Sequence, residues 1–471
     1  MRPSRSFIMS EPIHRDAGAR PDDGPGDEDL VLLRPIESSG VGFRVSTSLL
    51  LLLILGIWVL FGRQLVYGLT VTGLNQPVAW GFYIVNFVFF IGISHAGTLI
   101  SAILRLCNAE WRRPITRMAE VITVIVLAIG GFHPVLDLGR PERMLNIFTA
   151  GRLQSPLLWD VTSITAYFMA STVYLYIPMI PDIALLRDRG ARPHWFYTIL
   201  AWGWQGTPRQ RAVLDRAVSI MMVLVIPIAV SVHTVISYIF AMTLQPGWHS
   251  TIFGPYFVMG AIFSGIAALL ILMITLRKIF HLEGYLKEIH FSHLSKLLLV
   301  MSLVWFYFTF SEYLTAFFAH EPTEMRVLNY KFHGPYAVFF WGMVVCNFVV
   351  PVLILSFRRT RRIPGILIAS MTVVVGMWLE RLNIVIPSLA NPRLPYPTGF
   401  YIPGLVEWGM FVGAIASFVL GIVVFARFFP LISIWEIREG REQSIRETTE
   451  RLESYLPDPP PALAVTPAKD A

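Results

Sequence analysis

His133 and Asp160 carry the side chains best suited to chemistry in this sequence, and they stand at the facing ends of two consecutive apolar segments. The run FHPVLDLGRPERM contains the histidine, and the run SPLLWDV contains the acid. If the chain leaves a membrane after the first segment and re-enters it with the second, both side chains lie at similar depth. A histidine and a carboxylate can each hydrogen-bond a phenolic oxygen and accept its proton as electrons leave. We therefore predict that His133 and Asp160 form a quinol site near one membrane surface.

The turn between these two segments carries further charges. We interpret Asp137 and Arg140 as a pair that holds the loop, without a role in chemistry. His133 stands directly before Pro134, and a residue before proline is biased away from helical geometry, so His133 is predicted to end its helix. The alternative for His133 and Asp160 is that they too only stabilise this turn.

Other ionisable side chains lie deeper within apolar segments, where burial is costly and a functional role is the default explanation. Taken singly, His95 and His233 are most simply packing histidines that hydrogen-bond across helices. Taken together, His95, His233, Glu312 and Glu380 suggest a polar path for protons. Glu380 and Arg381 are adjacent, so their side chains point about 100° apart on a helix. Arg381 is therefore expected to neutralise an acid on another helix, and both residues are weaker candidates for the quinol site.

The elements that must position these residues are apolar helices. The chain has 471 residues, a mean hydropathy of +0.59, and only 15% charged residues. A soluble protein cannot hide that much apolar surface, so the composition predicts an integral membrane protein. At 1.5 Å per residue, about 20 residues cross the ~30 Å hydrocarbon core. The ten candidate segments are approximately Ser46–Phe61, Ala79–Leu104, Met118–Leu136, Leu157–Ile180, Val218–Leu244, Phe253–Leu276, Leu294–Phe318, Tyr336–Phe357, Ile363–Ile386 and Ile402–Phe425.

The segments show a weak internal repeat. The second ends with GISHAGTLISAILRL and the sixth with GAIFSGIAALLILMITLRK, while the fourth and eighth are entered through SPLLW and GPYAVFFW. We expect an all-α integral membrane fold with two four-helix bundles, made of helices 2–5 (about residues 79–244) and helices 6–9 (about 253–386), flanked by helices 1 and 10. The alternative is that small residues and leucine runs simply recur in all membrane helices.

Both ends of the chain are polar. Residues 1–43 are predicted to be a soluble, extended arm, residues 44–434 the membrane domain, and residues 435–471 a soluble tail whose stretch REGREQSIRETTERLES can form a charged helix. The arm lacks the pattern of a signal peptide. Lys and Arg gather in the loops on the side of the N-terminus, which the positive-inside rule assigns to the cytoplasm. An even number of helices then puts both termini in the cytoplasm, and His133 and Asp160 near the outer surface.

Several functions lack their parts in this sequence. Cys107 and Cys346 are far apart, whereas disulfide frameworks, zinc sites and iron–sulfur clusters need grouped thiolates. The histidines are single on their helices, which disfavours a bis-histidine haem. There is no P-loop, nucleophile elbow or HExxH motif. The net charge of +7 is attributed to membrane orientation, since no basic run with interleaved aromatics suggests nucleic-acid binding. No metal site is expected.

The run GGFHPVLDLGRPERMLNIF, followed by SPLLWDV and preceded by GISHAGTLISAILR, resembles the NrfD/polysulfide-reductase membrane-subunit family. The resemblance covers essentially Ser46–Phe425, and DLGRP with SPLLWD is its most specific part. Within the family, the ten helices and the polar ends are most similar to the ActC subunit of bacterial alternative complex III. The family's second such subunit, ActF, shares the fold but is thought not to bind quinol, and the intact motif with His133 favours ActC.

The resemblance implies a subunit with two four-helix bundles and no haem or iron–sulfur cluster of its own, which is inactive alone. It would oxidise menaquinol or another quinol near the periplasmic face of the bacterial inner membrane, with His133 and Asp160 at the quinol site. Its implied partners are an iron–sulfur subunit at the periplasmic face, multihaem c-type cytochrome subunits and a second NrfD-like membrane subunit. Proton translocation would accompany electron transfer along the polar path.

Two other functions fit the same residues. A secondary transporter of an ion or small solute also needs buried charges and a repeat. A membrane anchor of a molybdopterin or polysulfide-reductase-type complex differs from the first hypothesis only in the partner that docks.

Overall fold

Every regular element of the described residues is a helix. The computed structural model describes residues 30–37 and 40–455, and within these ranges nine helices are long and apolar enough to cross a membrane. A tenth, shorter apolar helix, Phe82–His95, continues through a π-helical turn into a further helical segment. Helices suit this environment because lipid offers no partners for backbone N–H and C=O groups. The prediction of an all-α integral membrane protein with about ten spanning helices is confirmed.

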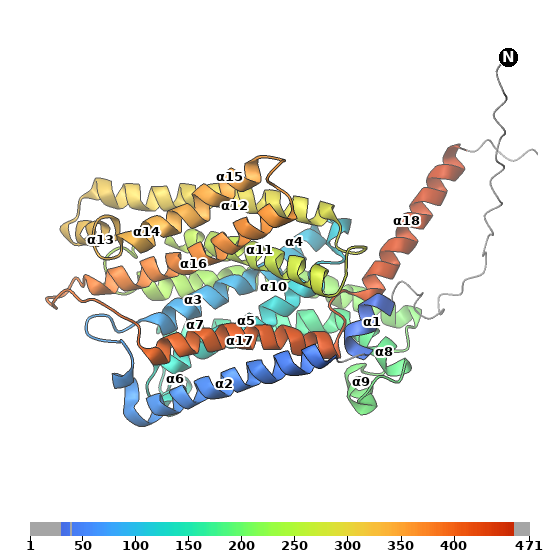
Figure 1. Ribbon diagram of the computed structural model, residues 1–471, viewed down its shortest axis with the longest axis horizontal. Coiled ribbons are helices and arrows are strands. Elements are labelled where there is room, and N and C mark those ends of the chain that lie inside the picture. The colour runs from blue at the N-terminus through green and yellow to red at the C-terminus, as the bar shows by residue number, and fades with distance from the viewer. Residues whose placement is uncertain (1–29, 38–39, 456–471) are drawn as a thin grey trace, which may run out of the picture.

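The spanning elements alternate in direction along the chain (Figure 1). They are α2 (Val41–Tyr67), α3 (Phe82–His95) with η3 (Ala96–Ile100) and α4 (Ser101–Leu106), α5 (Thr116–Asp137), α7 (Pro156–Tyr176) with η6 (Ile177–Met179) and α8 (Ile180–Asp188), α10 (Pro208–Ala241), α11 (Phe253–Ile279), α12 (Glu288–Ala319), α14 (Ala337–Val344) with η7 (Val345–Val349) and α15 (Val350–Ser356), α16 (Ile363–Ala390) and α17 (Leu405–Phe428). The connecting elements are η2 (Gly68–Val71), η4 (Glu110–Arg112), η5 (Pro141–Arg143), α6 (Asn146–Thr149), α9 (His194–Leu200) and α13 (Pro322–Phe332), and the chain ends carry α1 (Leu30–Glu37) and α18 (Ile434–Tyr455).

Some helices run further than their apolar segments because polar residues cap them. Helix α10 begins at Pro208, ten residues before the apolar run, and its N-cap is Thr207. The Thr207 hydroxyl accepts from the backbone N–H of Gln210, and the Gln210 side chain accepts in turn from the Thr207 N–H. This capping box satisfies N–H groups that the start of a helix leaves free. Apolar periodicity alone therefore underestimates the length of α10.

Helices α3, α5, α11 and α16 form the interior of the molecule, and the other helices cover them. Helices α7 and α10 pack on one side of this interior, and α12, α14 and α15 pack on the other. Helices α2 and α17 lie side by side along the lower edge of Figure 1. Gly413 of α17 permits their close approach, since a Cβ added there would lie 2.9 Å from Ile57 of α2. The division of the chain into two bundles with soluble ends stays a prediction.

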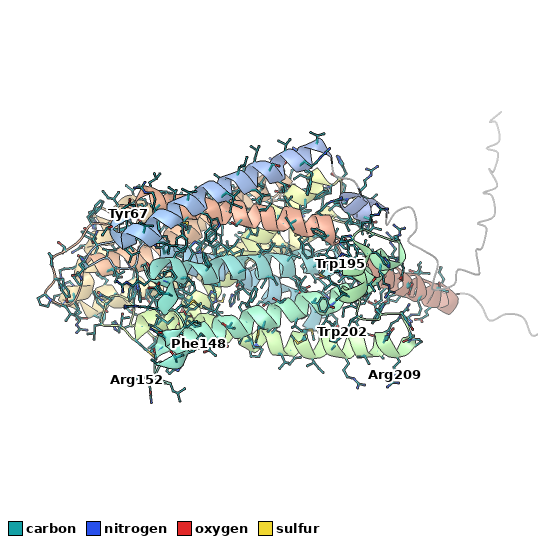
Figure 2. All side chains as sticks on the ribbon, turned by 90° about the horizontal axis from the view of Figure 1, so that it is seen from below. Tyr67, Phe148, Arg152, Trp195, Trp202 and Arg209 are labelled. Carbon is teal, nitrogen blue, oxygen red and sulfur yellow. The ribbon has the colours of Figure 1, made fainter. Side chains whose placement is uncertain are left out.

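The two ends of the helical body differ. We call the end that carries η2, α6 and α13 the loop end, and the end that carries α1, α8 and α9 the tail end (Figure 1). Figure 2 shows Phe148 and Arg152 at the loop end and Trp195, Trp202 and Arg209 toward the tail end. Exposed aromatic side chains at the ends of an apolar body are typical of the interface between lipid and water.

The extended arm predicted for residues 1–43 is wrong over its described part. Residues 30–37 form helix α1, and α2 already begins at Val41. The apolar side chains of Leu32, Leu33 and Ile36 are buried, and α1 packs on α17. The Arg427 guanidinium donates hydrogen bonds to the carbonyls of Pro35 and Ile36, where the helix leaves them free. The buried side chains of Leu32, Leu33 and Ile36 thus dock this short helix. Residues 1–29 and 456–471 lie outside the described residues.

The helix predicted to end at His133 continues to Asp137, with Pro134 inside it. Proline removes only one backbone N–H, and the hydrogen bond from Leu138 N to Pro134 O, 3.2 Å, is present on the far side of it. Because Pro134 stands in the last turn of α5, the loss of one bond does not break the helix. His133 is therefore helical, and its position in the helix determines the direction in which its side chain points.

Candidate functional site

A small apolar cavity lies between α2, α5 and α17, in the half of the molecule nearer the loop end. Its volume is about 250 Å³. Two of its lining side chains are polar, His133 and Ser417. The lining residues are Ile54, Ile57, Trp58, Ala128, Ile129, Phe132, His133, Leu136, Met410, Gly413, Ala414 and Ser417. Such a cavity, apolar with one or two polar groups, has the usual chemistry of a site for a small apolar ligand.

His133 presents one free nitrogen at this cavity. Its Nδ1 lies 2.8 Å from the backbone carbonyl of Ile129, and since a carbonyl can only accept, Nδ1 carries the proton. Its Nε2 is buried and has no hydrogen-bond partner. The ring also packs against Phe90 of α3, with ring centroids 5.5 Å apart. The imidazole is thus held in one tautomer and orientation, with Nε2 available as a proton acceptor.

Asp160 is the fifth residue of α7 and is almost fully buried, at 6% exposure. Its Oδ1 has no hydrogen-bond partner. A Cβ added to Gly131 of α5 would lie 3.6 Å from Ile164 of α7, one turn from Asp160. With this antiparallel register, Asp160 and His133 differ by about half a turn in depth. The two helices are neighbours, but Asp160 does not line the cavity that His133 lines.

The expected pair of Asp137 and Arg140 does not form. Arg140 is exposed, and no ion pair joins it to Asp137. Asp137 instead keeps a buried Oδ1 without a hydrogen-bond partner, at the last residue of α5. The reason is the continuation of the helix, because Gly139, with φ of +63°, turns the chain away before Arg140.

His95 and His233 contact each other deep in the interior. Their ring centroids are 3.7 Å apart, and both side chains are fully buried. His95 Nε2 lies 2.6 Å from the carbonyl of Ala229, whereas both ring nitrogens of His233 lack a partner. The π-helical turn η3 begins directly after His95, and such turns are frequent at functional sites. The sequence identified both histidines as candidates for a buried polar role but did not predict that they contact each other.

Glu380 and Arg381 pair with each other, which corrects the expectation that Arg381 neutralises an acid on another helix. Arg381 Nη1 lies 3.2 Å from Glu380 Oε2, and both side chains are 1% exposed. The Glu380 Oε1 accepts a hydrogen bond of 2.8 Å from Trp305 Nε1. Long flexible side chains can curl back, so the angle between neighbouring Cα–Cβ bonds does not decide where their charges meet.

Glycines open the space for the Arg381 guanidinium. A Cβ at Gly260 of α11 would lie 2.9 Å from Arg381 Nη2, and one at Gly92 of α3 would lie 3.9 Å from it. Gly92 is about one turn from His95, so the guanidinium reaches from α16 to the level of the histidine pair. Neither Glu380 nor Arg381 lines the cavity beside His133.

Glu312 lies apart from these groups, toward the loop end of α12. It accepts a hydrogen bond from Ser250 in the connection between α10 and α11. Lys331 of α13 interacts with it electrostatically and lies over the Tyr313 ring, with Nζ 5.3 Å from the ring centroid. Glu312 is therefore part of a loop-end contact between α12 and the elements around it.

Lys331 gives this contact a pH dependence. Burial lowers its pKa from the ordinary 10.5 to about 8, although Glu312 raises it. Between pH 8 and 10.5 the unfolded chain therefore holds a proton at Lys331 that the folded chain lacks, so stability rises with pH across this window. We expect Lys331→Met to abolish that rise. Thermal unfolding of the purified protein from pH 7 to 10.5 checks this, with exposed Lys287→Met as the control, and an undiminished rise in Lys331→Met would contradict it.

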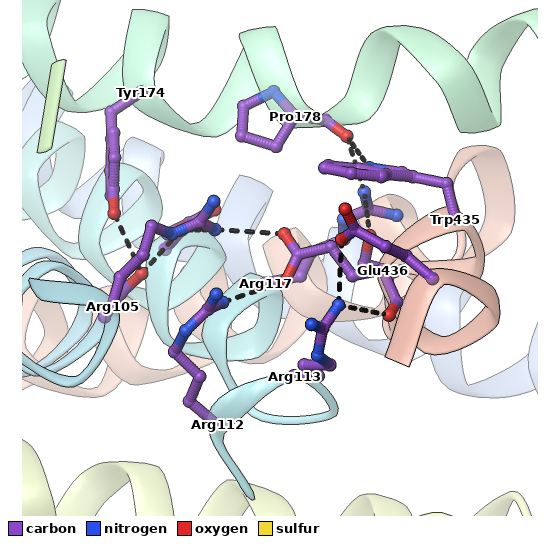
Figure 3. A network of polar contacts seen from close by, with 12 residues as sticks. Arg105, Arg112, Arg113, Arg117, Tyr174, Pro178, Trp435 and Glu436 are labelled. Atoms are coloured by element: carbon purple, nitrogen blue, oxygen red, sulfur yellow. Dashed lines mark hydrogen bonds and ion pairs between the residues drawn. The ribbon is translucent and has the colours of Figure 1, made fainter. Parts of the chain in front are cut away.

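A polar network at the tail end, shown in Figure 3, was missed in the sequence. Arg105 and Arg112 each donate to one carboxylate oxygen of Glu436 at 3.0 Å, and Arg113 donates to the Glu436 backbone carbonyl at 2.8 Å. Burial alone would raise the pKa of Glu436, but Arg105, Arg112 and Arg117 together hold it below its usual value. The first turn of α18 is thereby fastened to the membrane domain.

Two buried acids belong to the same network. Asp182 lies 2.5 Å from Arg117, and both side chains are 2% exposed. Glu120 accepts a hydrogen bond of 2.7 Å from Ser101, whose oxygen lies 3.2 Å from the Tyr174 hydroxyl. Glu120 stands inside the predicted segment Met118–Leu136, so the criterion that selected His133 could have found it.

A larger hollow, about 710 Å³, opens at the tail end between α8, the start of α10 and α18. Charged side chains of both signs line it, among them Asp188, Arg211 and Arg446. It holds none of the candidate site residues, and its charged lining does not suit an apolar ligand. The smaller cavity at His133 is the better candidate site.

The chain matches known proteins over most of its length. The family model described as polysulphide reductase, NrfD, matches residues 70–392. A dimethyl sulfoxide reductase membrane subunit of Halobacterium salinarum is 26% identical over 86% of this chain and 95% of that protein. A selenate reductase subunit of Mesobacillus selenatarsenatis is 24% identical over 82% of this chain and 94% of its own length. An Hdr-like menaquinol oxidoreductase integral membrane subunit of Archaeoglobus fulgidus is 22% identical over 79% of this chain and 89% of its own length.

Proposed function

The chain belongs to the NrfD polysulphide reductase family, and from this premise we propose that it is the quinol-binding membrane subunit of a respiratory or photosynthetic quinol:acceptor oxidoreductase. Relatives named as subunits of reductases and of a menaquinol oxidoreductase support a subunit role in a redox complex, and the menaquinol oxidoreductase name supports quinone as substrate. The chain would be inactive without its partners.

The observation that carries this proposal is the cavity with His133 Nε2 as its free buried acceptor. Its walls come from α2 and α17, and α2 exposes most of its apolar surface. The lining side chains of Trp58 on α2 and Phe132 on α5 are 50% and 37% exposed, so a quinol dissolved in lipid could approach between α2 and α5. The apolar lining suits the ring and the isoprenoid tail, and the imidazole suits the phenolic hydroxyl.

In the proposed reaction the quinol hydroxyl donates a hydrogen bond to His133 Nε2. The phenolic O–H breaks and Nε2 gains the proton, while electrons pass to the one-electron acceptor of a partner subunit. The Nδ1–H bond to the Ile129 carbonyl keeps the ring aligned throughout. Asp160, with its free buried Oδ1, is proposed to take the proton of the second hydroxyl. Loss of two protons and two electrons yields the quinone.

The finer proposal is bacterial alternative complex III, with this chain in the role of ActC and menaquinol as the substrate. Quinol would be oxidised near the periplasmic face of the inner membrane, with both termini in the cytoplasm. An iron–sulfur subunit at the periplasmic face, multihaem c-type cytochromes and a second NrfD-like subunit would be the partners. This chain would hold no haem or cluster of its own.

Proton translocation is a further part of the proposal, along His95, His233, Glu312 and Glu380. The contact between the two histidines, and the reach of Arg381 toward them, support a link between the bundle interior and Glu380. Glu380 and Arg381 are also candidate quinol ligands, but neither lines the cavity, which favours the proton path for Glu380.

A second candidate function is the membrane subunit of a substrate reductase that draws electrons from quinol. The names of the relatives from Halobacterium and Mesobacillus, dimethyl sulfoxide reductase and selenate reductase subunits, favour it. The quinol chemistry at His133 would be the same, and only the partner would differ. Identification of the partner proteins that co-purify with the chain separates the two candidates.

Filling the cavity tests the proposed function. Ala414 lines the cavity from α17, whereas its neighbour Ile415 is 45% exposed on the lipid-facing side. We expect Ala414→Phe in the assembled complex to raise the KM for quinol about tenfold or more, because a 1.4 kcal/mol loss of binding is already tenfold. Ile415→Phe adds the same ring outside the cavity and should leave KM unchanged. Equal KM values in wild type and Ala414→Phe would exclude this cavity as the quinol site.

A further inference from the structure

We propose that Asp137 is the outlet for the quinol proton, which it receives from His133 and releases to water at the loop end. This inference rests on the proposed function, since it concerns the fate of the proton that His133 accepts. It assigns a role to the acid of the DLGRP motif, which the sequence alone had suggested was a partner of Arg140.

Asp137 stands where such an outlet is needed. It follows His133 by four residues on α5, so the two side chains lie on one face of the helix, about 6 Å apart along its axis. Leu136 beside it lines the cavity, and Asp137 is the last residue of the helix, nearer the loop end than His133. The Asp137 side chain is partly exposed, while its Oδ1 is buried and has no hydrogen-bond partner. The carboxyl group therefore connects the buried level of the cavity with the surface.

None of the charged and polar groups described around Asp137 donates a hydrogen bond to its buried Oδ1, so a purely structural role does not account for this carboxyl group. Gln64 of α2 donates to the Leu136 carbonyl at 2.6 Å, and the Tyr83 hydroxyl of α3 donates to the Gln64 side chain at 2.5 Å. The Tyr83 hydroxyl and one N–H of Gln64 are thus directed to other acceptors. Arg140 on the following loop is exposed and makes no ion pair with Asp137. A buried carboxylate oxygen without a donor is costly, which argues that it serves the reaction.

Glu407 of α17, the other acid that faces Asp137, provides the contrast. Its Oε2 accepts from the backbone N–H groups of Gly73 and Gly404, both at 2.7 Å, and its Oε1 accepts from the Tyr401 hydroxyl. Glu407 thus has donors on both oxygens and holds the connections that precede α3 and α17 together. Of these two neighbouring acids, Asp137 is the one with a free buried oxygen.

The transfer leaves every group as it began. After the quinol proton reaches His133 Nε2, the imidazolium loses it as the Nε2–H bond breaks and an O–H bond forms on Asp137, directly or through one water. The imidazole returns to its neutral form, with Nδ1–H still bonded to Ile129. The carboxylic acid of Asp137 then releases the proton to water, and His133 is ready for the next quinol. The electrons leave separately, to the acceptor of the partner subunit.

Asp137→Asn in the full complex tests the proposal, because an amide cannot carry the proton. We expect kcat to fall about 10- to 100-fold with little change in the KM for quinol, and the solvent isotope effect on kcat to rise, since proton release becomes limiting. Asp137→Glu should restore most of kcat with a shifted pH dependence. Glu142→Gln, an exposed acid on the same loop, should match wild type.

The outcomes separate the two proposals. If Asp137→Asn keeps wild-type kcat and isotope effect while His133→Ala loses turnover, the outlet is overturned and the quinol site stands. If neither variant changes turnover, the proposed function fails as well. If Asp137→Asn reduces assembly of the complex, the Asp137→Glu variant provides the test instead. An unshifted pH dependence of kcat in Asp137→Glu would contradict the proposal that Asp137 is the proton outlet.

Discussion

Replacing His133 by alanine is expected to lower quinol:acceptor turnover about 100-fold or more, within the range that general acid–base catalysis contributes. The variant removes Nε2, the buried acceptor of the cavity, and leaves the apolar walls in place. Binding of the quinol ring and tail should therefore survive, so kcat should fall far more than KM rises. Steady-state turnover of the assembled complex with a soluble quinol measures both constants.

A matched control separates the loss of this imidazole from the loss of any histidine. His194 is exposed at the start of α9, at the tail end, and its alanine variant should keep wild-type turnover. Equal assembly of the two variants, judged by co-purification of the partner proteins, shows that the effect is catalytic. Near-normal turnover of His133→Ala would remove this residue from the site and leave Asp160 without its proposed counterpart.

The helices of this protein were predictable because lipid imposes a simple rule on sequence. An apolar run of sufficient length must become a helix, so all ten segments were located. Their ends were less predictable where polar caps or short apolar stretches decide them. Thr207 starts α10 well before its apolar run, and Leu32 and Leu33 dock α1 in a region expected to be extended.

Of the residues predicted for the quinol site, His133 lines the cavity and Asp160 does not, and the role of both stays a proposal. The motif and the antiparallel connection already suggested that His133 and Asp160 lie at similar depth, and the register of Gly131 against Ile164 agrees. The cavity, however, is closed by α2 and α17, whose residues stand far from His133 in the sequence. No pattern around His133 indicates which distant helices will cover it, because that depends on the packing of the whole body.

The polar network at the tail end was the feature that the sequence predicted least. Arg105 and Glu436 are separated by 331 residues, and the predicted soluble tail gave no reason to pair them. The positive-inside rule relates these arginines only to orientation, because it counts charges without regard to their partners. In the structure the same charges also hold the first turn of α18. The two roles are compatible, and only the first is visible in composition.

The ion pair between Arg117 and Asp182 is expected to matter most for stability. Arg117→Met should cost about 3–5 kcal/mol, because it leaves Asp182 as an uncompensated charge in a buried place. Arg117 also donates to the Pro178 carbonyl at 3.0 Å and to Ser433 Oγ at 3.1 Å, so further acceptors lose their donor. Thermal or denaturant unfolding of the protein in detergent measures the loss.

The exposed pair of Arg393 and Glu321 offers a control with the same chemistry. Their side chains are 53% and 40% exposed, and Arg393→Met should change stability by less than about 1 kcal/mol. The double variant Arg117→Met/Asp182→Leu should recover part of the stability lost in Arg117→Met, because no buried charge is left alone. A single variant as stable as wild type would contradict the assignment of this pair as a buried, coupled contact.

Recovery in the double variant should not extend to α18. Asp182 accepts hydrogen bonds of 3.1 Å from the backbone N–H groups of Ile434 and Trp435, the first residues of that helix. Leucine at this position cannot accept them, so the first turn of α18 loses a cap even when the membrane domain regains stability. Limited proteolysis should cut near residue 434 faster in the double variant than in wild type. Equal cleavage rates would mean that Glu436 and its arginines hold α18 without Asp182.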